Sequence, residues 1–319
     1  MKFQAKIFLR AAFLAAAFLI SVSISAQDWM DDEDYGLVRK GFEFGLNFGV
    51  YQAKHDAATF YEGDGDYVLG SNDFNLYSIQ NYIDDFNQQE IRMQNILGWN
   101  EPLEVWTYPI MRYDISMMFG LKGTYFFNDE NAFVIGINSS FLKASGNYSL
   151  KNQTGLNDQF NSTLEFDVVA NERRYISNLG YRTSLYITDY STWIFGLGVT
   201  STTCQIISNE FYVENEPFDL LVSTNPGTIG SPGISNPGVR KPSNTGFGFY
   251  GIVGLEGMFE QGGNLEANFR ISRDRIKLGQ AEDTGEFGST GYDRVNWNFA
   301  LYITWMIPPH IGDFVRASF

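Results

Sequence analysis

The sequence contains a single cysteine, Cys204, and two histidines, His55 and His310. One cysteine cannot form an intramolecular disulfide, and it excludes a cysteine-based metal centre. Basic residues are also scarce, with 22 Lys and Arg against 37 Asp and Glu, so the net charge is -15. Much of the acid lies between residues 51 and 111. Such a surface repels phosphate backbones, and we therefore expect no nucleic acid among the partners.

Beyond Ala26 the chain has no uncharged apolar run close to the roughly 20 residues of a membrane-spanning helix. The one apolar run, residues 11–20, follows three basic residues and precedes small residues that end at Ala26. This is the order of a secretory signal peptide. We predict that residues 1–26 are removed and that residues 27–40 form a periplasmic N-terminal segment. An exported chain without such helices is either a secreted soluble protein or an outer-membrane β-barrel.

Aromatic residues and glycine are abundant, with 28 Phe, 18 Tyr and 32 Gly. Aromatic rings cover half-buried sheets and glycine marks close backbone approaches, so this composition favours β-structure. Eight segments alternate strictly between an apolar face and a small or polar face, which indicates strands. The predicted strands are residues 41–51, 113–126, 132–143, 174–187, 193–202, 247–259, 265–272 and 294–306.

The connections between these strands are of two kinds. Three are tight turns, and the other four are long, at about residues 52–112, 144–173, 203–246 and 273–293. Tight periplasmic turns and long extracellular loops are typical of outer-membrane barrels. The alternative is a soluble sandwich or lipocalin-like barrel. It would carry many charges on the second strand face, where this chain has mainly Gly, Ser, Thr and Asn.

Eight alternating strands, tight turns and long loops resemble the small outer-membrane barrels of the OmpA and OmpX type. The resemblance covers roughly residues 41–306 and concerns architecture, not a sequence motif. It implies an all-β fold, a closed antiparallel up-and-down transmembrane barrel surrounded by lipid in the bacterial outer membrane. It transfers no activity. One departure is a tail at residues 307–319, predicted to be periplasmic, where members of this type usually end on the last strand.

Aromatic residues gather at both ends of the predicted strands, where rings can lie between hydrocarbon and water. The predicted turn-side girdle contains Phe42, Tyr125, Phe133, Trp193, Phe259 and Trp305. The predicted loop-side girdle contains Tyr113, Phe141, Tyr175, Phe247 and Trp297.

Charged residues also occur on the inward faces of the strands. An eight-stranded barrel is just wide enough for side chains to fill it, and a buried charge without a partner is costly. We therefore expect an ion-pair network in the lumen, acting either as a rigid plug or as a gate. Its predicted members are Glu43, Lys122, Arg182, Glu256, Glu266 and Arg270.

The first long connection contains an amphipathic helix candidate over residues 76–97. Its apolar stripe either packs over the barrel mouth or docks another protein. The predicted stripe consists of Leu76, Ile79, Ile83, Phe86, Met93 and Leu97.

Candidates for chemistry are few. Asp64 and Asp66 alternate with glycine and suggest calcium, but the spacing does not continue into a calcium-binding loop. His55 beside Asp56 could be a general base, since some barrels of this size modify lipids with a histidine at the loop-side rim. His310 falls in the tail, far from such a site. We expect no cofactor, because the chain has no serine-hydrolase, phosphate-loop or zinc motif.

The leading hypothesis is therefore a non-enzymatic barrel whose extracellular loops bind a partner, such as another subunit of an envelope complex. A stiffened third loop, with five prolines between residues 217 and 242, could serve as an interaction arm. A lipid-modifying enzyme and a narrow, porin-like small-solute channel remain as alternatives.

Overall fold

The computed structural model describes residues 41–65, 74–76, 78–85, 87–152, 163–188, 190–223, 243–258, 264–279 and 291–307. The predicted signal peptide, the segment 27–40, and most of the tail and the proline-rich loop lie outside these residues. The strands are β1 (Gly41–Gln52), β2 (Phe74–Leu76), β3 (Leu103–Thr107), β4 (Arg112–Tyr113), β5 (Ser116–Phe126), β6 (Asn131–Asn152), β7 (Thr163–Thr188), β8 (Ser191–Val213), β9 (Glu216–Asp219), β10 (Leu221–Ser223), β11 (Ser243–Met258), β12 (Asn264–Leu278) and β13 (Tyr292–Met306). The helices are η1 (His55–Tyr61, a 3₁₀-helix), α2 (Ile79–Asp85) and α3 (Asn87–Leu97).

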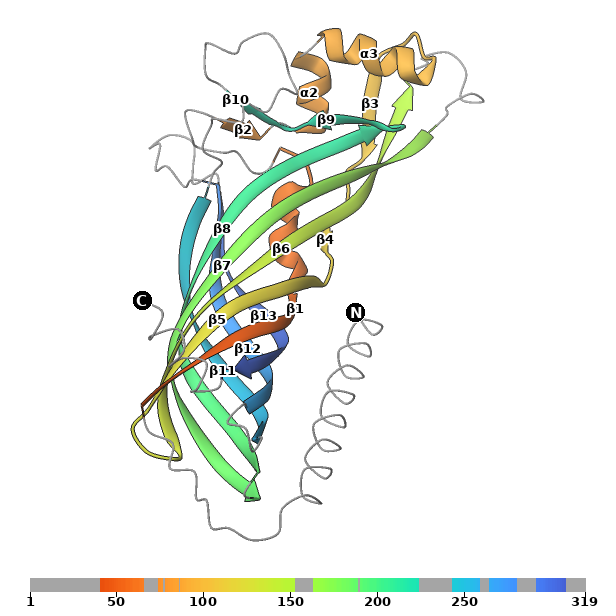
Figure 1. Ribbon diagram of the computed structural model, residues 1–319. Helices are drawn as coiled ribbons and strands as arrows, with labels where there is room; N and C mark the ends of the chain where they lie inside the picture. The colour runs from red at the N-terminus through yellow and green to blue at the C-terminus, as the bar shows by residue number, and fades with distance from the viewer. Residues whose placement is uncertain are drawn as a thin grey trace, which may run out of the picture.

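Eight of these strands form a closed antiparallel ring, as predicted. β1, β5, β6, β7, β8, β11, β12 and β13 each pair with the next in this order, and β13 pairs with β1 to close the ring (Figure 1). Closure satisfies the backbone donors and acceptors at both edges, which an open sheet would leave unpaired. The described residues are thus an all-β barrel with a small helical addition.

Four strands run further than predicted, so the limits of the second, third and fourth long loops need correction. β12 continues to Leu278, so residues 273–278 of the fourth predicted loop are strand. β6 and β7 stay paired from Asn131 opposite Thr183 up to Lys151 opposite Thr163. β8 follows β7 and continues to Val213. Residues 144–152, 163–173 and 203–213 are therefore strand and not loop. β6, β7 and β8 curve together beyond the rest of the ring (Figure 1).

The polarity of the strand faces reverses along these long strands. In the turn-side half of β6, Ile135 and Ile137 point outward and are exposed, while Asn138 is buried inside. In the loop-side half, Leu142 and Leu150 point inward and are buried, while the outward residues are mainly polar. The turn-side half, here called the lower half, therefore has the outward apolar face of a membrane barrel. The loop-side half, here called the upper half, has an apolar interior like that of a soluble protein.

A cap lies over the loop-side end, formed by α2, α3, β3 and β9 (Figure 1). Its apolar residues join η1 and the inward faces of β6, β7 and β8 in one buried cluster. Within this cluster the rings of Tyr82 on α2, Phe211 on β8 and Phe218 on β9 contact one another. The cap is thus packed onto the barrel and is not a set of separate loops. No helix among the described residues is long and apolar enough to cross a membrane.

Candidate functional site

The outer wall of the lower half carries a continuous apolar belt. Nine of the predicted girdle residues are exposed on it, as expected, and Phe259 lies outside the described residues. The exposed girdle residues are Phe42, Tyr125, Phe133, Phe141, Tyr175, Trp193, Phe247, Trp297 and Trp305. Exposed apolar patches larger than a few hundred square ångströms mark contact surfaces, and a belt around a closed barrel fits lipid.

The prediction that Tyr113 belongs to this girdle is wrong. Tyr113 is only 1% exposed and points inward. Tyr113 on β4 lies opposite Ala144, whereas Met118 on β5 lies opposite Ser140. From Tyr113 to Met118 the chain advances five residues, while β6 advances only four between their partners. This one-residue bulge reverses the alternation, because each extra residue moves the following side chains to the other face.

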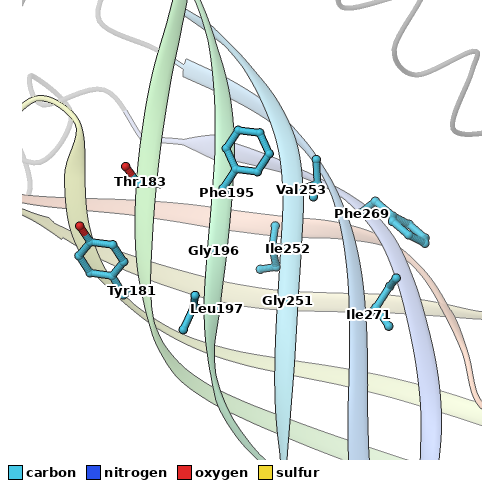
Figure 2. Close-up of a pocket in the computed structure, with 10 residues that line it drawn as sticks. All are labelled: Tyr181, Thr183, Phe195, Gly196, Leu197, Gly251, Ile252, Val253, Phe269 and Ile271. Atoms are coloured by element: carbon cyan, nitrogen blue, oxygen red, sulfur yellow. The ribbon is translucent and has the colours of Figure 1, made fainter.

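Figure 2 shows an apolar groove of about 370 Å³ on the outer wall of β7, β8, β11 and β12. Gly251 lies directly opposite Leu197 on β8 and Ile271 on β12. Phe195, Val253 and Phe269 lie two residues further along the same three strands, on one side of this row. Gly251 faces outward in the belt, and its missing side chain leaves the notch. Nearly all of the lining is apolar, so the groove is part of the lipid-facing wall.

Inside the lower half, four of the six predicted charges meet in one buried group, here called the lower ion cluster (Lys122, Arg182, Glu256 and Glu266). Lys122 pairs with Glu266. Arg182 lies between two carboxylates, with Nη1 2.5 Å from Glu266 Oε1 and Nη2 2.5 Å from Glu256 Oε2. All four side chains are buried. The charges compensate one another, which offsets their desolvation cost.

The other two predicted members occupy different positions. Arg270 is buried above the lower ion cluster, with its guanidinium 4.6 Å from the ring centre of Tyr250 and Nη2 donating to Thr200 Oγ1 at 3.1 Å. It is stabilised by a cation–π contact and not by a described carboxylate. Glu43 is half-buried near the turn-side end, where its backbone lies opposite Thr124.

A second buried ion pair, which the sequence reasoning missed, lies where the upper half begins. Arg174 Nε is 2.5 Å from Glu172 Oε1, and both residues are fully buried. The hydroxyls of Tyr61 and Tyr113 donate to Glu172 Oε2 at 3.1 Å and 2.5 Å. Together with Tyr51, whose hydroxyl accepts from Arg174 Nη1 at 3.3 Å, these residues form the upper ion cluster.

The upper ion cluster ties η1 to the barrel wall. Tyr61 is the last residue of η1, and burial together with the neighbouring Glu172 carboxylate raises the pKa of Tyr61 well above its usual value. Its hydroxyl therefore stays protonated and donates to Glu172. The predicted strand starts at Arg174, which points inward. Glu172 lies two residues before Arg174 and therefore points inward as well, so the alternation of the strand could have identified Glu172 as a buried residue.

The space left in the lumen is small. A cavity of about 20 Å³ lies among Asn47, Asn138, Asn178 and Tyr302, next to the lower ion cluster. This volume holds about one water molecule. Above it the interior is filled by the upper ion cluster and by apolar residues of η1, including Ala57, Ala58 and Phe60. The described lumen is therefore a packed interior, as either a rigid plug or a closed gate would be.

The predicted helix is two helices, and its stripe is not available for docking. The chain forms α2 and α3, and Leu76 belongs to β2. Ile79, Ile83 and Met93 are fully buried and Leu97 is partly buried in the cap, while Phe86 lies outside the described residues. The described residues of the stripe therefore pack over the barrel mouth, the first of the two interpretations considered for it.

His55 begins η1 at the loop-side rim. Its Nδ1 accepts a hydrogen bond of 3.2 Å from the backbone N–H of Tyr113, and Asp56 forms an ion pair with Lys54. Burial, with a further contribution from the nearby Arg112 charge, lowers the pKa of His55 from its usual value. The geometry gives the histidine a role in holding η1 to β4.

The metal candidates do not form a site in the described part of the chain. Asp64 is half-buried after η1, and Asp66 lies outside the described residues. No group of three or more His, Cys, Asp or Glu side chains that could hold a metal ion is found within the described ranges.

Comparison with known proteins gives similarity only at the level of fold. No protein-family model and no curated protein matches the chain. Among solved structures, the outer membrane protein OprG from Pseudomonas aeruginosa has a TM-score of 0.35 at 13% identity, covering 85% of this chain and 97% of OprG. Ail, the attachment invasion locus protein of Yersinia pestis, has a TM-score of 0.31 at 8% identity, covering 84% of this chain and 100% of Ail. A second Ail structure, in complex with the heparin analogue sucrose octasulfate, has a TM-score of 0.28 at 11% identity.

The strand pairing and the external belt themselves define the class of protein. A closed eight-stranded antiparallel ring with an outward apolar face, aromatic residues at both ends of that face and a packed polar interior is the architecture of an outer-membrane β-barrel.

Proposed function

We propose that this protein resides in the bacterial outer membrane as a non-conducting barrel whose cap binds another envelope protein. The belt supports the membrane location, because a wall of exposed Phe, Leu, Ile and Trp is stable only against lipid. The packed lumen supports the absence of conduction. The cap supports binding, since it is held rigidly on three extended strands.

The observation that carries the binding role is two exposed apolar side chains, Trp106 on β3 and Ile110 between β3 and β4, here together called the cap stripe. Trp106 is 58% exposed and Ile110 is 73% exposed. β3 pairs with the polar upper part of β6, so the cap stripe is separate from the belt. Exposed aromatic residues on a rigid element are typical anchors of protein interfaces.

The position of the cap stripe makes its exposure costly unless something covers it. Burying one large apolar side chain contributes about 1.5–3 kcal/mol. Trp106 also has Lys151 Nζ 4.6 Å from its ring centre, a cation–π contact that holds the indole in place on the surface. A preorganised tryptophan loses little conformational freedom on binding, which favours affinity.

The test is affinity purification of the full-length tagged protein from outer membranes in mild detergent, with quantitative mass spectrometry of the companions. We expect a stoichiometric companion that is lost from Trp106→Glu and from Ile110→Glu. Ile91→Glu is the matched control, because Ile91 is 55% exposed on α3, elsewhere on the cap. A wild-type barrel that purifies alone, or a companion that all three variants retain, would contradict the proposed interface.

A further inference from the structure

The bulge between β4 and β5 opens the outer wall at the loop-side edge of the belt. β4 pairs with β6 at Tyr113 opposite Ala144, and β5 resumes the pairing at Met118 opposite Ser140. Between these points the regular pairing is interrupted, although the backbone N–H of Asp114 still donates to the carbonyl of Lys143 at 2.9 Å. A groove of about 490 Å³ lies beside this interruption, here called the rim groove.

The lower part of the rim groove is an apolar slot. Met117, Phe119 and Phe141 line it and are each about half exposed, as belt residues are. Ser139, directly opposite Phe119, also lines the slot. Because serine is small, it leaves room between the larger neighbours. A slot of this kind within the belt has the apolar lining that an acyl chain requires.

The upper part of the rim groove is cationic. Lys143 is exposed, and Arg173 is half-buried on the neighbouring strand β7. Arg173 is held in position, because Nη1 donates to the Tyr175 hydroxyl at 3.3 Å and its guanidinium lies 5.7 Å from the ring centre of Phe141. Asp114 also lines the rim groove, so two positive charges and one negative charge leave a net positive charge.

We propose that the rim groove binds a phosphorylated lipid of the outer leaflet, with its phosphate between Lys143 and Arg173 and one acyl chain in the slot. Cations just outside a hydrocarbon layer attract anionic headgroups, and a positioned guanidinium suits phosphate oxygens. Arg173 lies directly opposite Phe141, and Lys143 lies two residues above Phe141 on β6. One amphiphile can therefore occupy both parts. The inference rests on the membrane location proposed above but not on the binding role of the cap.

The test is native mass spectrometry of the full-length protein in detergent micelles, titrated with diphosphoryl lipid A. We expect one tightly bound lipid on the wild type. Each basic residue near a membrane surface contributes about 1 kcal/mol, so Lys143→Gln combined with Arg173→Gln should weaken binding about 30-fold. Ser139→Leu should also weaken binding by filling the slot without changing any charge.

Two controls separate this site from general attraction. Arg273→Gln combined with Lys277→Gln removes two positive charges from the outward face of β12, away from the rim groove, and should leave binding unchanged. Phosphatidylcholine, whose headgroup is zwitterionic, should bind far more weakly than lipid A. Equal losses in both double variants, equal binding of phosphatidylcholine, or unchanged binding in the Lys143 and Arg173 double variant would overturn the proposal.

Membrane insertion is measured in parallel by resistance to carbonate extraction. Variants that lose lipid A binding but stay in the membrane support the site and keep the proposed location. A wild-type chain that carbonate removes from the membrane would instead contradict the proposed location, and with it the lipid site.

Discussion

Arg174 and Glu172 lie two residues apart on β7 and point to the same side, so that Arg174 Nε contacts Glu172 Oε1 at 2.5 Å with both side chains fully buried. Neighbours at this spacing share one face of a strand. The pair lies where the polar lumen of the lower half meets the apolar interior of the upper half. Glu172 accepts the hydrogen bonds from the hydroxyls of Tyr61 and Tyr113 that attach η1 and β4 to the wall.

Replacing Glu172 with Gln should therefore destabilise the protein strongly. The variant leaves the Arg174 charge buried without its partner, which typically costs about 3–5 kcal/mol. Urea unfolding in detergent, followed by tryptophan fluorescence, measures the loss. Glu165→Gln is the control, because Glu165 is an exposed acid on the same strand, and we expect a change within about 0.5 kcal/mol. Equal midpoints for the two variants would show that the buried pair adds no stability.

Conductance provides a test of the packed lumen. We expect a planar bilayer containing the wild-type protein to show no discrete current steps, since the described cavity is only about 20 Å³. Arg182→Ala should also be silent, although it opens the lower ion cluster, because η1 and the upper ion cluster still fill the lumen above it. Steps from the wild type would contradict the plug. Steps from Arg182→Ala alone would show that the upper half does not seal.

The stability of the folded protein should depend on pH through His55, which holds η1 to β4. Burial and Arg112 lower the pKa of His55 in the folded protein, whereas in the unfolded chain it is about 6.5. The unfolded state therefore binds more protons as the pH falls through 6.5, and the stability that His55 contributes above that pH is lost. Urea midpoints at pH 7.5 and pH 5 measure the difference. His55→Asn should reduce it, and an unchanged difference would exclude this histidine as its source.

Replacing glycine with alanine should destabilise the protein where the glycine faces the packed lumen, but not where it faces outward. A Cβ at Gly198 would lie 2.3 Å from the Leu179 carbonyl oxygen and 2.8 Å from Tyr250 Cε1, so Gly198→Ala should cost about 1–3 kcal/mol. At Gly251 the nearest atom, the Gly196 carbonyl oxygen, is 3.9 Å away. Gly251→Ala should therefore be nearly neutral in the same unfolding assay. Similar losses from both variants would contradict the packing around Tyr250.

The sequence predicted the lower half well, because lipid outside and a narrow lumen inside impose one strict alternation of residue types. Trp193, Phe195 and Leu197 could be assigned to the outer face from this pattern alone. The same rule failed at Tyr113. The bulge between β4 and β5 reverses which side chains point inward, and no residue in the sequence indicates this bulge. The alternation identified the faces but could not reveal that local shift.

The upper half was harder to predict because its pattern is the reverse of the lower one. The outward residues Lys143 and Arg173 end the apolar face. Because the apolar alternation stops there, the sequence predicts that the strands end at Lys143 and begin at Arg174. The inward residues Leu150, Phe166 and Val168 continue the alternation with opposite polarity, and the structure shows them buried. The pairing of Glu172 with Arg174 is local, but its tyrosine partners come from residues 51, 61 and 113. Contacts over that separation depend on the closed ring.

The reversal of polarity along β6, β7 and β8 also constrains the order of assembly. The interior of the cap consists largely of the inward faces of these three strands together with η1, so it does not exist until the ring has closed. A chain whose ring has not yet closed has no template on which α2 and α3 could fold. The cap should therefore acquire its structure only after the strands have been inserted, on the far side of the membrane, and protease resistance of the cap should appear no earlier than that of the barrel.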